Sequence, residues 1–282
     1  MTKSSNPLEQ SSTENTMAPS QFSNNNDTSR MYDSHERLIS LSALLQDHDY
    51  TPTDYDIAYF KRINEAVRDT LISEDANVSH SYPYAVRIVK ATQRIYLVSK
   101  HLAWARDIDI MAMYSAALIC GIGAPNDWDI ELGSTTLEQA EVAQDAHWNT
   151  LRDLLDAVKT PALVAGTASY MASFIPFSRE LANPTALDVA IIEYPALKIV
   201  LDAQRVSEMG AVGVVKAKDG AEWLKLMEER FVKYLGMMKT KAGGQEAGKA
   251  WEFMVDLREK LLKEVECEVV LDGEVVRMGV VE

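Results

Sequence analysis

The sequence predicts an all-α fold, and three observations carry this prediction. Apolar residues recur at helical spacing through most of the chain after residue 35. The stretch from Ile108 to Cys120 is apolar almost throughout, and a helix that is apolar on every side must be buried, so we expect it at the centre of a helical bundle. A strong strand signal, an Asp272-Gly273 turn between β-branched runs, lies near the C-terminus and predicts a small β-hairpin over residues 266–280.

The composition narrows the classes of function. The 282 residues are 47% hydrophobic and 25% charged, as in ordinary globular domains. Their 28 Lys and Arg against 42 Asp and Glu give a formal charge of −14, which argues against a nucleic-acid partner because phosphate-backbone binding needs a basic face. No apolar stretch reaches the roughly 18 to 20 residues of a membrane-spanning helix. We expect no nucleic acid and no membrane insertion, and homo-oligomerisation stays open.

The cysteines and the N-terminal segment indicate the compartment and the domain organisation. With only Cys120 and Cys267 a disulfide framework is not expected, and no apolar signal-peptide core precedes the domain, so we expect a cytoplasmic protein. Residues 1–34 hold eight Ser, four Thr and five Asn and few large apolar residues, which predicts a disordered polar tail. A single domain is expected over residues 35–282.

The first predicted helices follow the apolar spacing in chain order. They cover residues 38–45, 57–71, a segment that Ser79 caps and that continues to about Leu102, and 108–120. Further helices are expected over residues 137–158, 163–174 and 185–209, with Pro195 as a break, and then over 221–238 and 246–265. The Gly243-Gly244 pair is expected in the connection between the last two helices.

Three segments of the sequence are similar to motifs of one family. Residues 79–88 read SHSYPYAVRI and resemble s-H-D-w-x-H-x-x-R-V, and residues 116–123 read AALICGIG and resemble A-A-L-L-H-D-I-G. Residues 201–214 read LDAQRVSEMGAVGV and resemble Q-D-A-D-R-L-D-A-M-G-A-I-G-I. Together, in this order and spacing, they resemble the HD-domain metal-dependent phosphohydrolases. This resemblance implies an HD-domain-like helical bundle.

The residues that would hold the metal in that family are replaced in this chain. Tyr84 stands at the position of the first His, Cys120 and Gly121 replace the His-Asp pair, and Gln204 replaces the last Asp. A divalent ion prefers anionic oxygen or imidazole ligands, so these four positions offer at most one good donor, the Cys120 thiol. We therefore expect no metal and no other cofactor.

The resemblance and the surrounding side chains together give a set of candidate site residues. The expected catalytic residues are Tyr84, Gln204 and His80, whose polar groups would orient a neutral, hydrophobic small-molecule substrate. Expected substrate-binding residues are Tyr82, Arg87, Tyr114, Cys120, Trp128 and Arg205. The structural alternatives stay open: a hydrogen-bonded His80, a packed core cysteine, aromatic core filling, and buried ion pairs made by Arg87, Asp202 and Arg205.

These residues favour a metal-independent enzyme as the first hypothesis. Cyclisation and pericyclic steps of the Diels-Alderase type need only correct positioning and a hydrogen-bond donor to a carbonyl. By analogy with fungal pathways that use such scaffolds, we expect a step in secondary-metabolite biosynthesis. The alternatives are a non-catalytic, HD-like binding protein and a residual metal-dependent phosphohydrolase that uses other ligands, such as His101 and His147.

Overall fold

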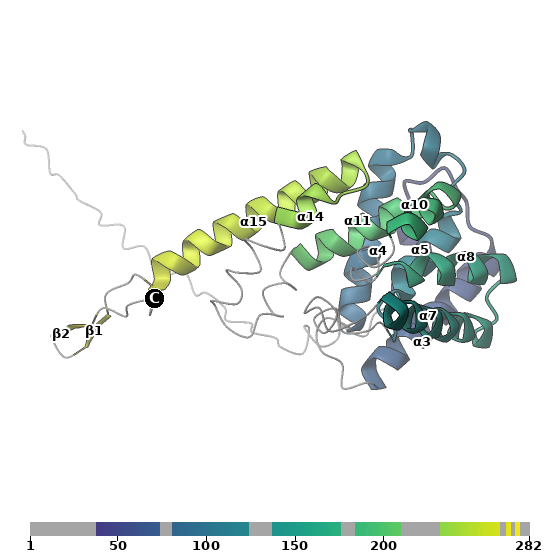
Figure 1. The fold of residues 1–282 in the computed structure, drawn as a ribbon, viewed down its shortest axis with the longest axis horizontal. Helices are drawn as coiled ribbons and strands as arrows, with labels where there is room; N and C mark the ends of the chain where they lie inside the picture. Colours follow the sequence, from purple (N-terminus) through teal and green to yellow (C-terminus); the bar gives the residue numbers. More distant parts are fainter. Residues whose placement is uncertain are drawn as a thin grey trace, which may run out of the picture. The chain divides into compact units, whose positions relative to one another are not determined.

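The structure is a computed structural model. In it the chain divides into two units, Met1–Glu36 and Arg37–Glu282. The structure describes residues 38–73, 81–123, 137–175, 184–209, 232–265, 269–271 and 274–276, all in the second unit. The predicted disordered tail over residues 1–34 lies outside the described residues. Within the described ranges the fold is helical, which confirms the all-α prediction (Figure 1).

The helices follow one another along the chain with short connections where these are described. Their bounds are α2 (Leu41–Leu44), α3 (Asp54–Ser73), α4 (Tyr82–Ser99), the 3-10 turn η2 (Ala103–Ala105), α5 (Ile110–Ile119), α7 (Leu137–Ala157), α8 (Ala162–Ser173), α10 (Pro184–Glu193), α11 (Ala196–Met209), α14 (Val232–Gly236) and α15 (Lys241–Val265). No helix in the described ranges combines the length and the apolarity needed to cross a lipid bilayer.

Helix α5 forms the centre of the bundle, as its apolar sequence predicts. Every residue from Met111 to Ile119 is buried, and the helix packs against α3, α4, α8 and α11. It begins at Ile110 because the Asp109 side chain accepts a hydrogen bond from Ala112 N at 2.9 Å and thereby caps the first turn. The helix therefore starts two residues later than Ile108, where the apolar run begins.

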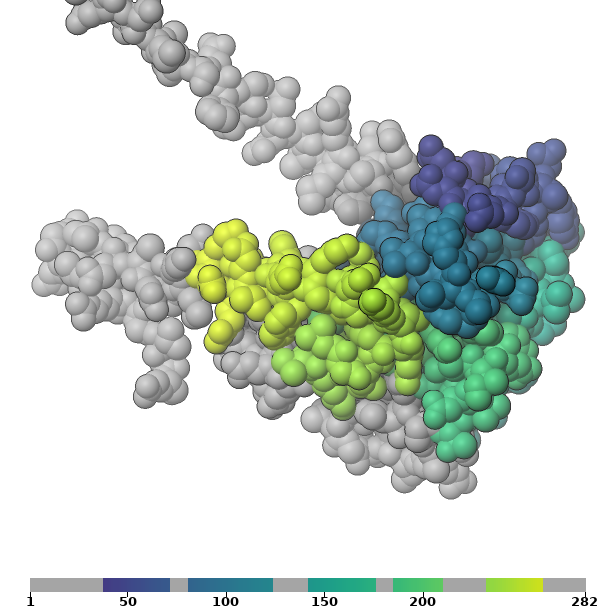
Figure 2. Space-filling model, turned by 90° about the horizontal axis from the view of Figure 1, so that it is seen from above, coloured from purple at the N-terminus to yellow at the C-terminus, as the bar shows by residue number. Residues whose placement is uncertain are grey.

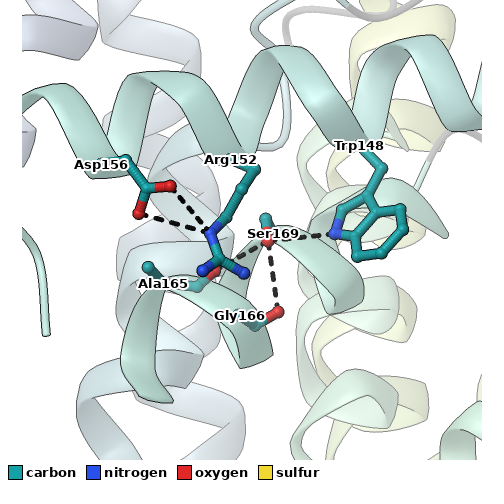
Figure 3. Close-up of polar contacts among 6 residues, drawn as sticks. All are labelled: Trp148, Arg152, Asp156, Ala165, Gly166 and Ser169. Atoms are coloured by element: carbon teal, nitrogen blue, oxygen red, sulfur yellow. Dashed lines mark hydrogen bonds and ion pairs between the residues drawn. The ribbon is translucent and has the colours of Figure 1, made fainter. Parts of the chain in front are cut away.

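Helices α7 and α8 pair through polar contacts as well as apolar ones. Figure 3 shows Trp148 of α7 donating from Nε1 to Ser169 Oγ of α8 at 3.2 Å, while Ser169 donates onward to Ala165 O at 2.7 Å. Arg152 lies over Gly166, where an added Cβ would come 3.4 Å from its Nη1, so the small residue lets α7 approach. The predicted helices over residues 137–158 and 163–174 are confirmed to within one residue at each end.

A second group of helices, α4, α11, α14 and α15, positions the candidate site. Helix α11 packs on α4, on α5 and on α15, and α15 also contacts α4. The expected break at Pro195 is confirmed: residues 185–209 form parts of two helices, α10 and α11, separated at Tyr194 and Pro195, because proline lacks the N–H that a continuous helix needs. Helix α4 has Ser81 at its N-cap position and Pro83 in its first turn. The expectation that Ser79 caps this helix is therefore wrong by two residues.

The expected connection at the Gly243-Gly244 pair is wrong, because both glycines lie inside α15. Thr240 precedes the helix and its Oγ1 accepts a hydrogen bond from Gly243 N at 2.8 Å, while Thr240 O accepts from Gly244 N at 3.0 Å. This cap satisfies N–H groups of the first turn, so the helix forms despite two residues of low helix propensity.

The C-terminal segment contains two short strands. Val269–Leu271 (β1) pairs antiparallel with Glu274–Val276 (β2), and Val270 faces Val275 in the register. Asp272 and Gly273, the predicted turn, lie outside the described residues, as does most of the remaining segment 266–280.

Candidate functional site

The structure brings Tyr84 and Gln204 together on one carboxylate. Tyr84, in the first turn of α4, donates from Oη to Glu208 Oε1 at 3.2 Å. Gln204, one turn before Glu208 on α11, donates from Nε2 to the same oxygen at 2.6 Å. Helices α4 and α11 pack directly on each other, so these positions meet although they are 120 residues apart in the chain.

A third donor reaches the other oxygen of this carboxylate. Tyr234 of α14 donates from Oη to Glu208 Oε2 at 2.7 Å. Tyr84, Gln204, Glu208 and Tyr234, here called the Glu208 cluster, are all buried. Two phenols and an amide therefore stabilise a carboxylate withdrawn from water, and the bonds tie α4, α11 and α14 together.

The other two positions that the resemblance aligns with metal ligands, Cys120 and Gly121, offer little further chemistry. Cys120 follows α5, is buried, and its thiol donates to Ala117 O at 3.4 Å. This placement fits the alternative of a packed core cysteine. Gly121 carries no side chain. Among the residues that the structure describes, no three His, Cys, Asp or Glu side chains are grouped in a way that could hold a metal ion.

Asp202 and Arg205 form a buried ion pair, which is the structural alternative for these two residues. Arg205 Nη1 lies 3.5 Å from Asp202 Oδ1 and donates to Met237 O at 2.5 Å. The Asp202 carboxylate also accepts hydrogen bonds from Lys239 N and from N and Oγ1 of Thr240, at 2.7 to 2.8 Å. These contacts hold α11 to the segment between α14 and α15.

Burial decides the protonation behaviour of this pair. Burial raises the pKa of Asp202 to about 6, although the hydrogen bonds from Lys239 and Thr240 lower this pKa. Burial also lowers the pKa of Arg205 to about 10, whereas the nearby Tyr234 and Glu208 raise the pKa of Arg205. The contacts of both groups support the packing of α11 rather than substrate binding.

The hydroxyls of Tyr82 and Tyr114 have partners away from the Glu208 cluster. Tyr82 donates to Asn64 Oδ1 at 2.7 Å and accepts from Ile39 N at 3.2 Å. Tyr114 shares a hydrogen bond of 2.7 Å with His48 Nε2. Burial is the main reason why the pKa values of both tyrosines are raised. These hydroxyls fix the segment around α2 and α3 onto α4 and α5.

Arg87 is the predicted residue that lines a described pocket. It lies one turn after Tyr84 on α4 and is half-buried, and the pocket has a volume of about 300 Å³. Burial lowers the pKa of its guanidinium, as does the neighbouring Arg94, while Tyr84 raises it. His80 and Trp128, the other two predicted residues, lie outside the described residues.

Sequence reasoning missed Glu208 and Tyr234. Glu208 follows Gln204 by four residues, which places both on the same face of one helix, so its role was accessible from helical spacing. Tyr234 lies 26 residues further on in a different helix, and no local pattern links it to Glu208.

Comparisons with known proteins assign no family. No family model and no curated protein matches the sequence. Among solved structures, the Bacillus subtilis protein YpgQ, crystallised in complex with ADP, is similar over 73% of this chain and 96% of its own, with 16% sequence identity and a TM-score of 0.45. At that identity and TM-score the likeness assigns neither a fold family nor a function to this chain.

Proposed function

We propose that this chain is a metal-independent enzyme on a degenerate HD-domain-like scaffold, acting on a small molecule whose reacting part is neutral and apolar. The observation that carries the proposal is the convergence of Tyr84 and Gln204 on Glu208. These two residues occupy positions where the resemblance places metal ligands, and their polar groups meet at one point. The reaction class proposed is a cyclisation or pericyclic step of the Diels-Alderase type in fungal secondary metabolism.

The Glu208 cluster supplies the interactions that such a step requires. The Gln204 amide has a second N–H besides the one that it donates to Glu208, and this N–H can donate to a substrate carbonyl and stabilise charge that develops on its oxygen. Tyr84 has a single O–H proton, so it donates to the substrate by turning this proton away from Glu208, which holds both side chains at one point beforehand. The chemistry relies on positioning and hydrogen bonding and uses no nucleophile.

A specific observation favours a second candidate, a non-catalytic binding protein. All four residues of the cluster are buried and bonded to one another. A buried polar network of this kind also stabilises helix packing without any role in chemistry. In that case the scaffold keeps its fold and acts through its surface.

Native mass spectrometry and elemental analysis of the purified full-length protein test the proposal first. We expect a co-purifying small organic molecule and no stoichiometric divalent metal. One zinc, manganese or iron ion per chain, together with phosphatase activity that EDTA abolishes, would instead establish the residual phosphohydrolase.

Variants then separate catalysis from packing once the co-purifying compound identifies the substrate. Loss of one hydrogen bond in a water-poor site costs on the order of 1 to 3 kcal/mol, so Tyr84→Phe and Gln204→Ala should slow turnover roughly 5- to 150-fold with the fold intact. Tyr234→Phe is the matched control, because it removes a bond to the same carboxylate from a position away from the resemblance motifs. Wild-type turnover in Tyr84→Phe and Gln204→Ala, with a lower melting temperature in all three variants, would establish the packing role.

A further inference from the structure

A pocket between α4, α11 and α15 is separate from the Glu208 cluster, since none of the four cluster residues lines it. Figure 2 shows the C-terminal helix α15, in yellow, lying beside the blue segment that contains α4. The pocket has a volume of about 300 Å³, at the lower end of the range for small-molecule sites. Its lining consists of Arg87, Lys90 and Arg94 from α4, Val206 and Ser207 from α11, and Glu246, Lys249 and Ala250 from α15.

The lining is strongly positive. It carries four cationic side chains and one carboxylate, Glu246. This carboxylate accepts from Arg94 Nε at 2.8 Å and from Lys249 Nζ at 2.7 Å, so its charge is already shared between two cations. The other three lining residues are uncharged, and the Ser207 hydroxyl donates to Ala203 O at 2.7 Å. The described lining therefore has a net formal charge of +3.

Arg87 and Lys90 provide the unused part of this charge. Neither side chain makes a hydrogen bond or an ion pair within the described ranges, whereas Arg94 and Lys249 both bind Glu246. Arg87 is half-buried, so part of its hydration is lost without replacement by a carboxylate. Residues 87, 90 and 94 are three and four apart in the chain, so they lie along one face of α4 and repel one another. An anion bound between these side chains would replace the lost hydration of Arg87 and reduce the repulsion among the three cations.

We propose that this pocket binds the phosphate group of a small phosphorylated molecule, with Arg87 as its principal ligand and Lys90 as a second. A guanidinium matches the spacing of two phosphate oxygens, and an ammonium can approach a third from another direction. A dianionic group also matches the net charge of +3 of the lining better than a monoanion does. The proposal goes beyond the proposed function and does not depend on it, because the Glu208 cluster takes no part.

Isothermal titration calorimetry of the full-length protein with inorganic phosphate, glycerol 3-phosphate and tricarballylate tests whether the site exists and whether it prefers phosphate to carboxylate. We expect saturable binding of the two phosphate compounds, tighter for the ester, and weaker binding of the tricarboxylate. Absence of saturable binding for both phosphate compounds would overturn the proposal. Tighter binding of tricarballylate than of glycerol 3-phosphate would overturn the phosphate class.

Charge variants locate the site. Arg87→Gln should weaken glycerol 3-phosphate binding roughly ten-fold or more, as loss of a charge-assisted hydrogen bond does. Lys90→Gln should weaken it about two- to five-fold. Lys90 is exposed, so this variant tests the proposal even if Arg87→Gln fails to fold. The matched controls are Arg152→Gln and Lys61→Gln, which remove the same charges from α7 and α3 and should change binding less than about two-fold.

A variant that removes a negative charge from the lining, and so should strengthen binding, completes the test. Glu246→Gln removes the carboxylate that occupies Arg94 and Lys249, so binding should become several-fold tighter. Equal binding in the wild type, in Arg87→Gln and in Lys90→Gln would overturn the proposal. Equal weakening in all four Arg and Lys variants would also overturn it, since it would reveal a response to total charge.

Discussion

Gly243 of α15 lies directly against the side chain of Asp202 of α11: a Cβ added at position 243 would come 2.6 Å from Asp202 Cγ, well inside van der Waals contact. The Asp202 carboxylate is fixed in this place by hydrogen bonds from Lys239 and Thr240, just before α15 begins. The helix and the carboxylate can approach this closely only because residue 243 has no side chain.

This contact predicts opposite effects for alanine at neighbouring glycines. Gly243→Ala should lower the free energy of unfolding by about 1 to 3 kcal/mol, because the new methyl group overpacks against a fixed carboxylate. Gly244→Ala and Gly248→Ala are the matched controls, since nothing lies within 4 Å of a Cβ at either position. Both should raise stability by about 0.5 to 1 kcal/mol through helix propensity.

Chemical denaturation of the three variants measures these differences. If Gly243→Ala is as stable as Gly244→Ala, then Asp202 yields to the methyl group and the glycine has no structural role.

The pKa of Asp202 predicts how stability changes with pH. Its folded value of about 6 lies above the ordinary value of 3.8, so the folded state binds a proton more tightly than the unfolded state does. This contribution to stability is fully present below about pH 4 and is lost as the pH rises through 6. The free energy of unfolding of the wild type relative to Asp202→Asn should therefore increase as the pH is lowered from 7 to 4.

Asp56→Asn is the control for this prediction. Burial raises the pKa of Asp56, but hydrogen bonds from Thr53 and Tyr50 outweigh burial, and the pKa is lowered. The wild-type advantage over Asp56→Asn should shrink as the pH falls. If the stability difference between the wild type and Asp202→Asn changes with pH in the same direction as the difference for Asp56→Asn, then the hydrogen bonds of Asp202 outweigh its burial.

The contacts of His48 with Tyr96 of α4 and Tyr114 of α5 are predicted to be sensitive to acid. Burial, followed by the charge of Lys100, lowers the pKa of His48 below 6.5, and its ring stacks on Tyr96 with centroids 5.0 Å apart. The neutral form is favoured by folding, so its contribution is present above pH 6.5 and is lost as the pH falls through the folded pKa. An NMR titration of the His48 ring should give a midpoint below 6.5, and a midpoint at or above 6.5 would contradict this placement.

Deletion of residues 1–34 tests the predicted polar tail. This segment has few large apolar residues, so removing it should leave the melting temperature within a few degrees of that of the full chain. A large decrease on truncation would show that the segment docks on the helical unit. Circular dichroism of the truncated and full-length proteins makes the comparison.

The parts of the fold that were predictable depend on local spacing. The apolar run around Met113 predicted the central helix, and the periodicity from Leu137 onward predicted α7. Both were predictable because residues three and four apart in the sequence lie on the same face of a helix. The start of α15 was not predictable, because the Gly243-Gly244 pair signals a loop while Thr240 and Asp202, a cap and a tertiary contact, decide the outcome.

The candidate site also has a part that sequence motifs predicted and a part that depends on how the helices pack. The resemblance motifs placed Tyr84 and Gln204 at related positions, and the structure brings them together on Glu208. Tyr234 and the pocket around Arg87 depend on how α14 and α15 pack on α4 and α11, and no residue pattern in one segment specifies that packing.

The positive pocket belongs to a chain whose formal charge is −14, and this contrast governs the kinetics of ligand exchange. Beyond the Debye length, about 8 Å at physiological salt, the charges of the molecule are largely screened, so an approaching anion gains no steering from the pocket. Within that length it meets Arg87 and Lys90. Long-range attraction therefore does not speed the encounter, and changes in affinity among the charge variants should appear mainly in the release rate.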